Sequence, residues 1–232
     1  MTQLIVDCDS ADFDWTGAGG LLAKAEGLAT DRAKDLPMLL LRGSPETAPE
    51  WAGRPNVFWL AEQGLDAAAR LRDLFPGEHV LPKAVAARPS THFTMGQHYT
   101  GDGFSYYVPD MTTYRTYRID DGDQYLADWL ERAKELNFET LLFDAPDARA
   151  EAKGFDLDLL EKIKRLFQGG IILSGGATEI VHFERLKKEG GCLGVLVPQA
   201  IGLTLGIQQI SELIMDPPAL EKSSQETEGA AA

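Results

Sequence analysis

Short apolar runs alternate along the chain with segments in which apolar residues recur at helical spacing. The runs are continuous rather than alternating with polar residues, which is typical of parallel strands covered on both faces. Strands are predicted at 3–9, 37–43, 56–62, 79–85, 104–110, 139–145, 170–176 and 193–199. Helices are predicted at 17–34, 63–75, 123–137, 156–168, 178–190 and 201–215.

This order of elements predicts the fold class. Eight strands with helices between them make a (β/α)8 TIM barrel, which we expect as a single domain over residues 1–216. An open doubly wound sheet is the alternative. Residues 86–118 show no helical pattern, so an irregular segment is expected to replace one helix of the barrel. Residues 217–232 are small and polar and are expected to form a disordered acidic tail.

Composition narrows the classes of partner. The 232 residues are 44% hydrophobic, which is sufficient for one substantial core. The formal net charge of −14 argues against nucleic acid and against an anionic membrane surface. Cys8 and Cys192 lie inside apolar runs and form no CxxC pair, so they are interpreted as buried thiols of a cytoplasmic protein. We expect neither a metal nor an organic cofactor.

Polar residues gather where the predicted strands end. In a TIM barrel the catalytic groups come from the carboxyl ends of the strands, so these residues should meet around one mouth above an apolar floor. Each could also mark no more than the point where a strand reaches solvent. The residues at these ends are Asp7, Asp9, Arg42, Glu62, Lys83, Asp110, Asp144 and Ser174.

Two aspartate groups carry candidate acid/base chemistry. Asp7 and Asp9 lie two residues apart on one face of a strand, close enough for one carboxylate to raise the pKa of the other. Asp144 ends the sixth predicted strand and could supply the second half of an acid/base pair. The alternatives are that Asp9 caps the following segment and that Asp144 to Asp147 forms an ordinary turn.

The segment 92–118 is rich in tyrosine, with arginine nearby. Tyrosine combines a flat apolar face with a polar tip, which suits a ligand ring or a protein interface. This segment is predicted either to mediate a homo-oligomer or protein contact, or to form a hairpin extension over the barrel.

The segment 125–202 is similar to the second half of the histidine-biosynthesis barrels, the family of the ribotide isomerase and the cyclase subunit of imidazole-glycerol-phosphate synthase. The shared order is a helix, a strand ending in an acid, a "KGFD" loop, a helix, a Ser-Gly-Gly strand and an "HF" helix. "SGGATEIVHF" is especially close to the cyclase pattern. The N-terminal "LIVDCDS" resembles the family's first strand, whose catalytic aspartate falls on Asp9.

The resemblance implies a phosphate site at Ser174, Gly175 and Gly176, where backbone N–H groups lead into a helix. A purely steric tight turn is the other explanation of the two glycines. The chain departs from the family at Pro198-Gln199, at "LAEQG" in place of a Gly-Gly-Gly turn after strand three, and at "PDARAE" after strand six. These departures imply that one phosphate site is kept and the other is lost.

We therefore expect an isomerase or lyase that acts by acid/base chemistry on a phosphorylated small metabolite, in coenzyme biosynthesis rather than histidine synthesis. Asp9 and Asp144 would exchange protons with the substrate. Lys83 would stabilise an enolate-like charge or form a Schiff base.

Further candidates for substrate contact are Asp7, Arg42 and Asp110. The alternative function is a non-catalytic binding or assembly protein on a decayed barrel, with residues 92–118 as its interface.

Overall fold

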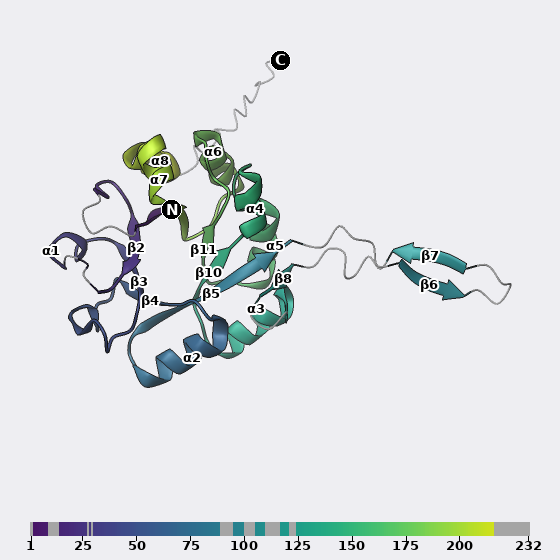
Figure 1. The fold of residues 1–232 in the computed structure, drawn as a ribbon, viewed down its shortest axis with the longest axis horizontal. Coiled ribbons are helices and arrows are strands. Elements are labelled where there is room, and N and C mark those ends of the chain that lie inside the picture. Colours follow the sequence, from purple (N-terminus) through teal and green to yellow (C-terminus); the bar gives the residue numbers. More distant parts are fainter. Residues whose placement is uncertain are drawn as a thin grey trace, which may run out of the picture.

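Eight parallel strands close into a barrel (Figure 1). The computed structural model describes residues 2–8, 14–26, 28, 30–88, 95–99, 105–109, 117–120 and 124–215. Neighbouring strands pair in the order β10-β11-β12-β1-β2-β3-β4-β5, and a further pairing of β5 with β10 closes the ring. The predicted TIM barrel is confirmed, and the open sheet is excluded. The barrel strands are β1 (Gln3–Asp7), β2 (Gly20–Lys24), β3 (Met38–Arg42), β4 (Val57–Ala61), β5 (His79–Ala87), β10 (Thr140–Asp144), β11 (Gly170–Ser174) and β12 (Gly194–Pro198).

The longer helices pack around the outside of the strands (Figure 1). In α5 (Leu157–Leu166) the side chain of Asp156 accepts a hydrogen bond from the Leu159 N–H and caps the first turn, while Leu160 and Ile163 face the barrel. The others are α2 (Gly64–Leu74), α3 (Leu126–Glu135), α6 (Ile180–Glu189) and α8 (Ile207–Met215). Shorter helices are α1 (Thr30–Ala33), the 3₁₀ turn η1 (Pro49–Trp51), α4 (Pro146–Glu151) and α7 (Gln199–Leu205).

The structure corrects the predicted set of barrel strands at two places, one strand that was predicted as helix and one predicted strand that is not in the barrel. The second strand is β2, which lies inside the segment predicted as a helix at 17–34, because "GLLAK" is a short apolar run that suits a buried strand as well as a helix. A Cβ on Gly20 would lie 2.8 Å from the Met38 carbonyl oxygen, so the backbone of β2 approaches β3 closely. The run predicted at 104–110 is not a barrel strand. Its described part is β7 (Ser105–Pro109), which pairs antiparallel with β6 (Met95–Tyr99) in a separate hairpin away from the barrel (Figure 1).

The irregular segment after β5 therefore contains a hairpin in its described part. It leaves the barrel at the carboxyl end of β5 and returns through β8 (Arg118–Ile119), which pairs with Ala86 and Ala87 of β5 and with β9 (Gln124–Tyr125). Most of the segment 92–118, together with Asp9, Asp110 and the tail 217–232, lies outside the described residues. The predictions placed on them stay predictions.

The core has two layers, inside and outside the barrel wall. The inner layer is an apolar plug to which every barrel strand contributes, and the outer layer fills the space between the wall and the helices. The plug consists of Ile5, Leu22, Met38, Leu40, Leu60, Leu81, Leu142, Ile172 and Leu196.

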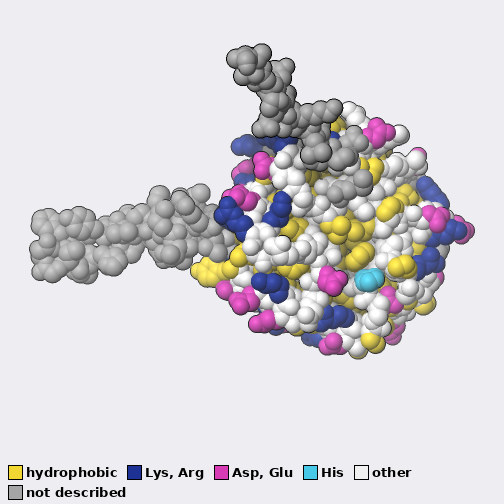
Figure 2. Space-filling model, turned by 180° about the vertical axis from the view of Figure 1, so that it is seen from behind, with side chains coloured by type: hydrophobic (Ala, Val, Ile, Leu, Met, Phe, Trp, Pro, Cys, Tyr) yellow, Lys and Arg dark blue, Asp and Glu magenta, His cyan; other side chains and the backbone are white. Residues whose placement is uncertain are grey.

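Surface charge is mixed, and both cysteines are buried as predicted. On the face shown in Figure 2, acidic and basic side chains are interspersed rather than gathered into a patch of one sign. None of the described helices combines the length and the apolar character needed to cross a bilayer.

Candidate functional site

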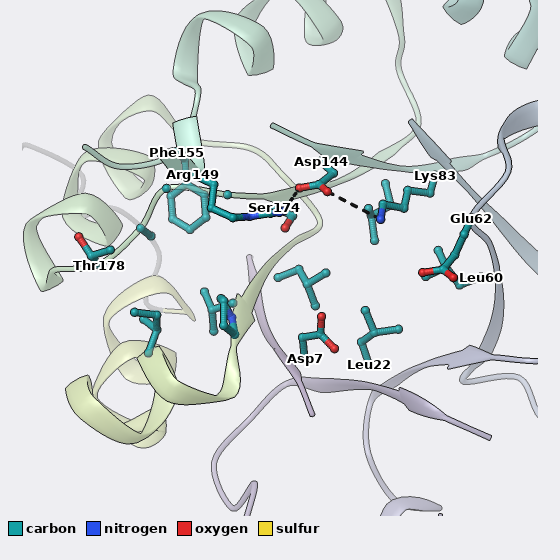
Figure 3. A pocket seen from close by; sticks show the side chains of 18 of the residues that line it. Asp7, Leu22, Leu60, Glu62, Lys83, Asp144, Arg149, Phe155, Ser174 and Thr178 are labelled. Atoms are coloured by element: carbon teal, nitrogen blue, oxygen red, sulfur yellow. Dashed lines mark hydrogen bonds and ion pairs between the residues drawn. The ribbon is translucent and has the colours of Figure 1, made fainter. Parts of the chain in front are cut away.

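A cavity of about 410 Å3 opens at the carboxyl ends of the barrel strands. Its position follows from the alternation of side chains along each strand, because residues two apart point to the same side. Two residues beyond the apolar plug, each of several strands places a polar side chain over it (Figure 3). The predicted polar mouth above an apolar floor is thus present. The polar lining comprises Asp7, Arg42, Glu62, Lys83, Asp144, Arg149, Ser174 and Thr178.

Asp144 is the most buried charged side chain of this lining, with 8% of the residue exposed. Its Oδ1 accepts a hydrogen bond from the guanidinium of Arg149, and its Oδ2 lies 3.7 Å from the Lys83 Nζ (Figure 3). Lys83 comes from β5 and Asp144 from the adjacent β10, so the contact is fixed by the pairing of two strands. The Asp144 carboxylate thus lies at the cavity wall between two cationic side chains.

A second ion-paired group lines the opposite part of the wall, on β1, β3 and the end of β4. Arg42 donates from one guanidinium nitrogen to both carboxylate oxygens of Asp7, each at 2.9 Å, and its Nε lies 3.4 Å from Glu62 Oε1. The predicted substrate-contact residues Asp7 and Arg42 thus face the same cavity as Asp144 and Lys83.

Ser174, Gly175 and Gly176 lie at the end of β11 and line the cavity. Both glycines adopt positive φ, +115° and +85°, a region that other residues rarely enter. A Cβ on Gly176 would lie 2.0 Å from the Gly154 carbonyl oxygen, so the turn has a steric reason for its glycines. The N–H groups of Gly176 and Ala177 nevertheless have no acceptor among the described residues.

The structure shows that a different turn follows barrel strand three from the one predicted in the comparison with the family. Because the sequence pattern does not reveal β2, "LAEQG" is predicted to end strand three, but its Leu-Ala ends β4 and its Glu-Gln-Gly follows β4. The turn that does follow β3 is Arg42-Gly43-Ser44, which holds one glycine and an arginine already paired with Asp7.

Two residues of the lining were not singled out from the sequence. Arg149 comes from α4, which begins at Pro146 in a stretch whose sequence also fits a simple turn. The proline at the first helical position was the signal that could have indicated a helix, and with it the position of Arg149. Thr178 precedes α6. By contrast Asp147, considered beside Asp144, accepts a hydrogen bond from the Arg88 backbone N–H at 2.7 Å and does not line the cavity.

Beside the cavity, the buried carboxylate of Asp156 binds both ends of the segment that connects β5 to β8. Asp156 Oδ2 accepts from Arg88 Nε at 2.7 Å, and Oδ1 accepts from the Tyr117 hydroxyl at 2.8 Å. Burial, together with the hydrogen bond to Asp156, raises the pKa of Tyr117 above its usual 10.0. The bond to Asp156 likewise raises the pKa of the Arg88 guanidinium.

The raised pKa of Tyr117 predicts a loss of stability in alkali. Above about pH 10 the unfolded tyrosine ionises while the folded one keeps its proton, so the free energy of unfolding should fall by about 1.4 kcal/mol per pH unit. This contribution is complete below pH 10 and is lost as pH rises. The free energy of unfolding is measured by urea titration between pH 8 and pH 11. Tyr117→Phe should remove this part of its pH dependence. If the free energies of the wild-type protein and the variant fall in parallel, the raised pKa of Tyr117 is contradicted.

Among the described residues, no group of three or more His, Cys, Asp or Glu side chains is placed to hold a metal ion. The described lining of the cavity offers carboxylates, amine and guanidinium groups, and backbone N–H groups.

Comparison with known proteins locates the strongest likeness in the second half of the chain. Residues 116–203 match the family described as "Histidine biosynthesis protein". The imidazole glycerol phosphate synthase subunit HisF of Corynebacterium glutamicum (strain R) is 38% identical over 56 residues, 24% of this chain and 22% of the relative. HisF of Nocardioides sp. is 38% identical over 63 residues, 27% of this chain and 24% of the relative.

A longer match is to HisF of Bifidobacterium longum (strain DJO10A), 30% identical over 115 residues, 50% of this chain and 40% of the relative. The chain thus covers less than half the length of the curated relatives it matches. The matched part supplies Asp144, Ser174 and both glycines of the cavity. Over residues 116–203 the chain is thus similar to the histidine-biosynthesis family, and its closed barrel is the fold expected from that similarity.

Proposed function

We propose that the protein is an enzyme, an isomerase or lyase that acts by acid/base chemistry on a small metabolite carrying one phosphate group. The observation that carries the proposal is the cavity itself, in which three carboxylates and three cations lie over an apolar floor at the carboxyl ends of the barrel strands. Ionisable groups are expensive to bury without a task or a partner. A volume of about 410 Å3 lies within the range of small-molecule sites.

The phosphate is assigned to the turn after β11. The N–H groups of Gly176 and Ala177 have no acceptor within the described part of the chain, and the ten-residue helix α6 follows with its positive end toward this turn. Arg149 lines the same cavity; its guanidinium donates to Asp144, but its side chain is 53% exposed, against 24% for Arg42, and has further N–H groups that can donate to a phosphate. Together these groups are suited to a dianionic ligand.

A single phosphate is favoured over two. On the other side of the wall Arg42 is engaged by Asp7, and Pro198 at the end of β12 has no N–H to offer. The HisF relatives are subunits named for imidazole glycerol phosphate synthase. The departures at Gly43 and Pro198 favour a different substrate for this chain, and we place its reaction in coenzyme rather than histidine biosynthesis.

Asp144 is assigned the proton transfer, because it is buried at the cavity wall between Lys83 and Arg149. Asp9, at the family's catalytic position, stays a predicted partner. A non-catalytic binding role remains the alternative, and it predicts ligand binding without turnover.

Phosphate binding is tested by thermal unfolding with inorganic phosphate, glycerol 3-phosphate and ribose 5-phosphate. A ligand at about 100 times its Kd should add about 2.7 kcal/mol, a rise of roughly 5–11 °C in Tm. Arg149→Gln should reduce this rise by more than half, because it removes the cation beside the turn.

Arg165→Gln is the matched control. Arg165 lies on α5, is 73% exposed, pairs with Glu161 and does not line the cavity, so its loss should leave the ligand-induced rise unchanged. Equal effects of the two substitutions, or no rise with any of the three ligands, would refute the assignment of a phosphate to this cavity.

A further inference from the structure

We infer that Lys83 binds its substrate covalently as an imine, so that the substrate class is a short aldehyde or ketone phosphate. The inference rests on the proposed function, since it names the substrate of the same cavity. It assigns to Lys83 the capture of the carbonyl carbon and to Asp144 the movement of protons between nitrogen and oxygen.

The placement of the Lys83 amine is the first support. Lys83 rises from the inner face of β5 directly above Leu81 of the apolar plug, and its side chain is 24% exposed. Its Nζ donates no hydrogen bond to any described residue, and its one described charge contact is with Asp144 Oδ2 at 3.7 Å. The amine therefore lies at the cavity beside the Asp144 carboxylate (Figure 3).

The contact with Asp144 is an ion pair without a direct hydrogen bond. A distance of 3.7 Å exceeds that of a hydrogen bond, whereas Arg149 binds the other carboxylate oxygen directly and balances its charge. Lys83 is thus not needed to neutralise Asp144. The two groups are close enough for a direct proton transfer once the amine moves onto the carboxylate, since catalytic hydrogen bonds are often long before substrate binds.

The reaction balances with these two groups alone. Asp144 takes a proton from the Lys83 ammonium, the free amine attacks the carbonyl carbon, and the carbonyl oxygen takes the proton back to give a carbinolamine. Asp144 then accepts a second proton from the nitrogen and gives it to the hydroxyl group, which leaves as water. The net change converts a carbonyl compound and an ammonium into an iminium and one water, which makes the neighbouring carbon acidic for isomerisation or cleavage.

The spacing of the groups sets the size of the substrate. Lys83, Asp144 and Ser174 lie on three adjacent strands, β5, β10 and β11, and Asp144 is directly paired with Ser174 in the register. Three strands span about 10 Å. A carbonyl carbon at Lys83 and a phosphate at the turn after Ser174 are therefore matched by a chain of a few carbon atoms.

Borohydride trapping tests the inference on the full chain. The protein is incubated with dihydroxyacetone phosphate or glyceraldehyde 3-phosphate, reduced with sodium borohydride and mapped by peptide mass spectrometry. We expect one adduct, at Lys83, with the mass of the ligand less one oxygen atom. Asp144→Asn should slow its formation by about 10²–10⁴-fold.

Lys24→Arg is the matched control for Lys83→Arg. Lys24 also ends a barrel strand, β2, but is exposed and does not line the cavity. Trapping should be lost in Lys83→Arg and retained in Lys24→Arg, with both variants folded by circular dichroism. Adducts spread over exposed lysines, or none at Lys83, would overturn the inference.

Glycerol 3-phosphate, which has no carbonyl group, separates this inference from the proposed function. If it raises Tm while neither carbonyl ligand is trapped at Lys83, the phosphate site stands and the imine is refuted. If glycerol 3-phosphate and both carbonyl phosphates fail to bind, the imine is refuted; if inorganic phosphate and ribose 5-phosphate fail as well, the proposed function is refuted with it.

Discussion

Replacing Asp156 with alanine should destabilise the protein by about 3 kcal/mol, because one buried carboxylate serves three partners. Asp156 is 4% exposed and accepts hydrogen bonds from Arg88, from Tyr117 and from the Leu159 N–H at the start of α5. Loss of a partner from a buried pair costs 3–5 kcal/mol, and loss of a helix cap about 1 kcal/mol. Arg88 is one-third exposed and keeps Glu151, so the loss of its pair with Asp156 should cost less than this range, which brings the total to about 3 kcal/mol.

The measurement is urea unfolding at pH 7, with a fall in Tm of roughly 6–12 °C as a second reading. Asp158→Ala is the matched control, since Asp158 lies two residues later, is 62% exposed, pairs with Lys162 on the same helix and accepts only a longer hydrogen bond, 3.2 Å, from Tyr117. An exposed pair of this kind contributes at most about 1 kcal/mol. Equal costs for the two substitutions would show that Asp156 does not hold this region together.

The hydrogen bonds of Asp156 also fix the chain at the mouth of the barrel. Arg88 directly follows β5, Tyr117 directly precedes β8, and both are bound to the carboxylate that caps α5. The long excursion between β5 and β8 therefore starts and ends on a fixed base beside the cavity. Asp156→Asn keeps the cap and loses the charge, so it should cost less than Asp156→Ala.

The fold class could be predicted from the sequence because buried parallel strands are continuous apolar runs. The same signal misassigned two strands. "GLLAK" and "SYYVP" are both five residues long, and run length cannot tell a barrel strand from a helical turn or a hairpin strand. The predicted helix at 201–215 is likewise two helices, because Gly206 has a φ of +83° between α7 and α8.

The candidate site was predictable wherever its residues end a barrel strand. Asp7, Arg42, Lys83 and Asp144 are charges that directly continue or closely follow apolar runs, and the closed barrel brings them to one cavity. Arg149 was not predictable in this way, because it enters from a helix beside the mouth.

The network around Asp156 has no local signal in the sequence. Its partners Arg88 and Tyr117 are 68 and 39 residues away along the chain, and only the return of the chain through β8 brings them together. The role of Asp156 as the cap of α5 is the one part that a local pattern could indicate.

The largest effect is expected for Gly176→Ala, which should cost more than about 4 kcal/mol or prevent folding. The added Cβ would meet the carbonyl oxygens of Gly154 at 2.0 Å and Ala148 at 2.7 Å, and both belong to rigid backbone. The positive φ of +85° adds about 1–2 kcal/mol of strain for a residue with a Cβ. Such a total belongs to the exceptional tail of single substitutions.

Gly53→Ala separates the two contributions. Gly53 also has a positive φ, +70°, but a Cβ there would meet nothing within 4 Å, so only the strain of about 1–2 kcal/mol should remain in urea unfolding. If Gly176→Ala costs no more than Gly53→Ala, the backbone around the turn can move apart and the packing argument fails. If it costs far more, a loss of phosphate binding in any Gly176 variant cannot be read as loss of an anion site, and Arg149→Gln, which leaves the turn intact, is the substitution that decides the chemistry.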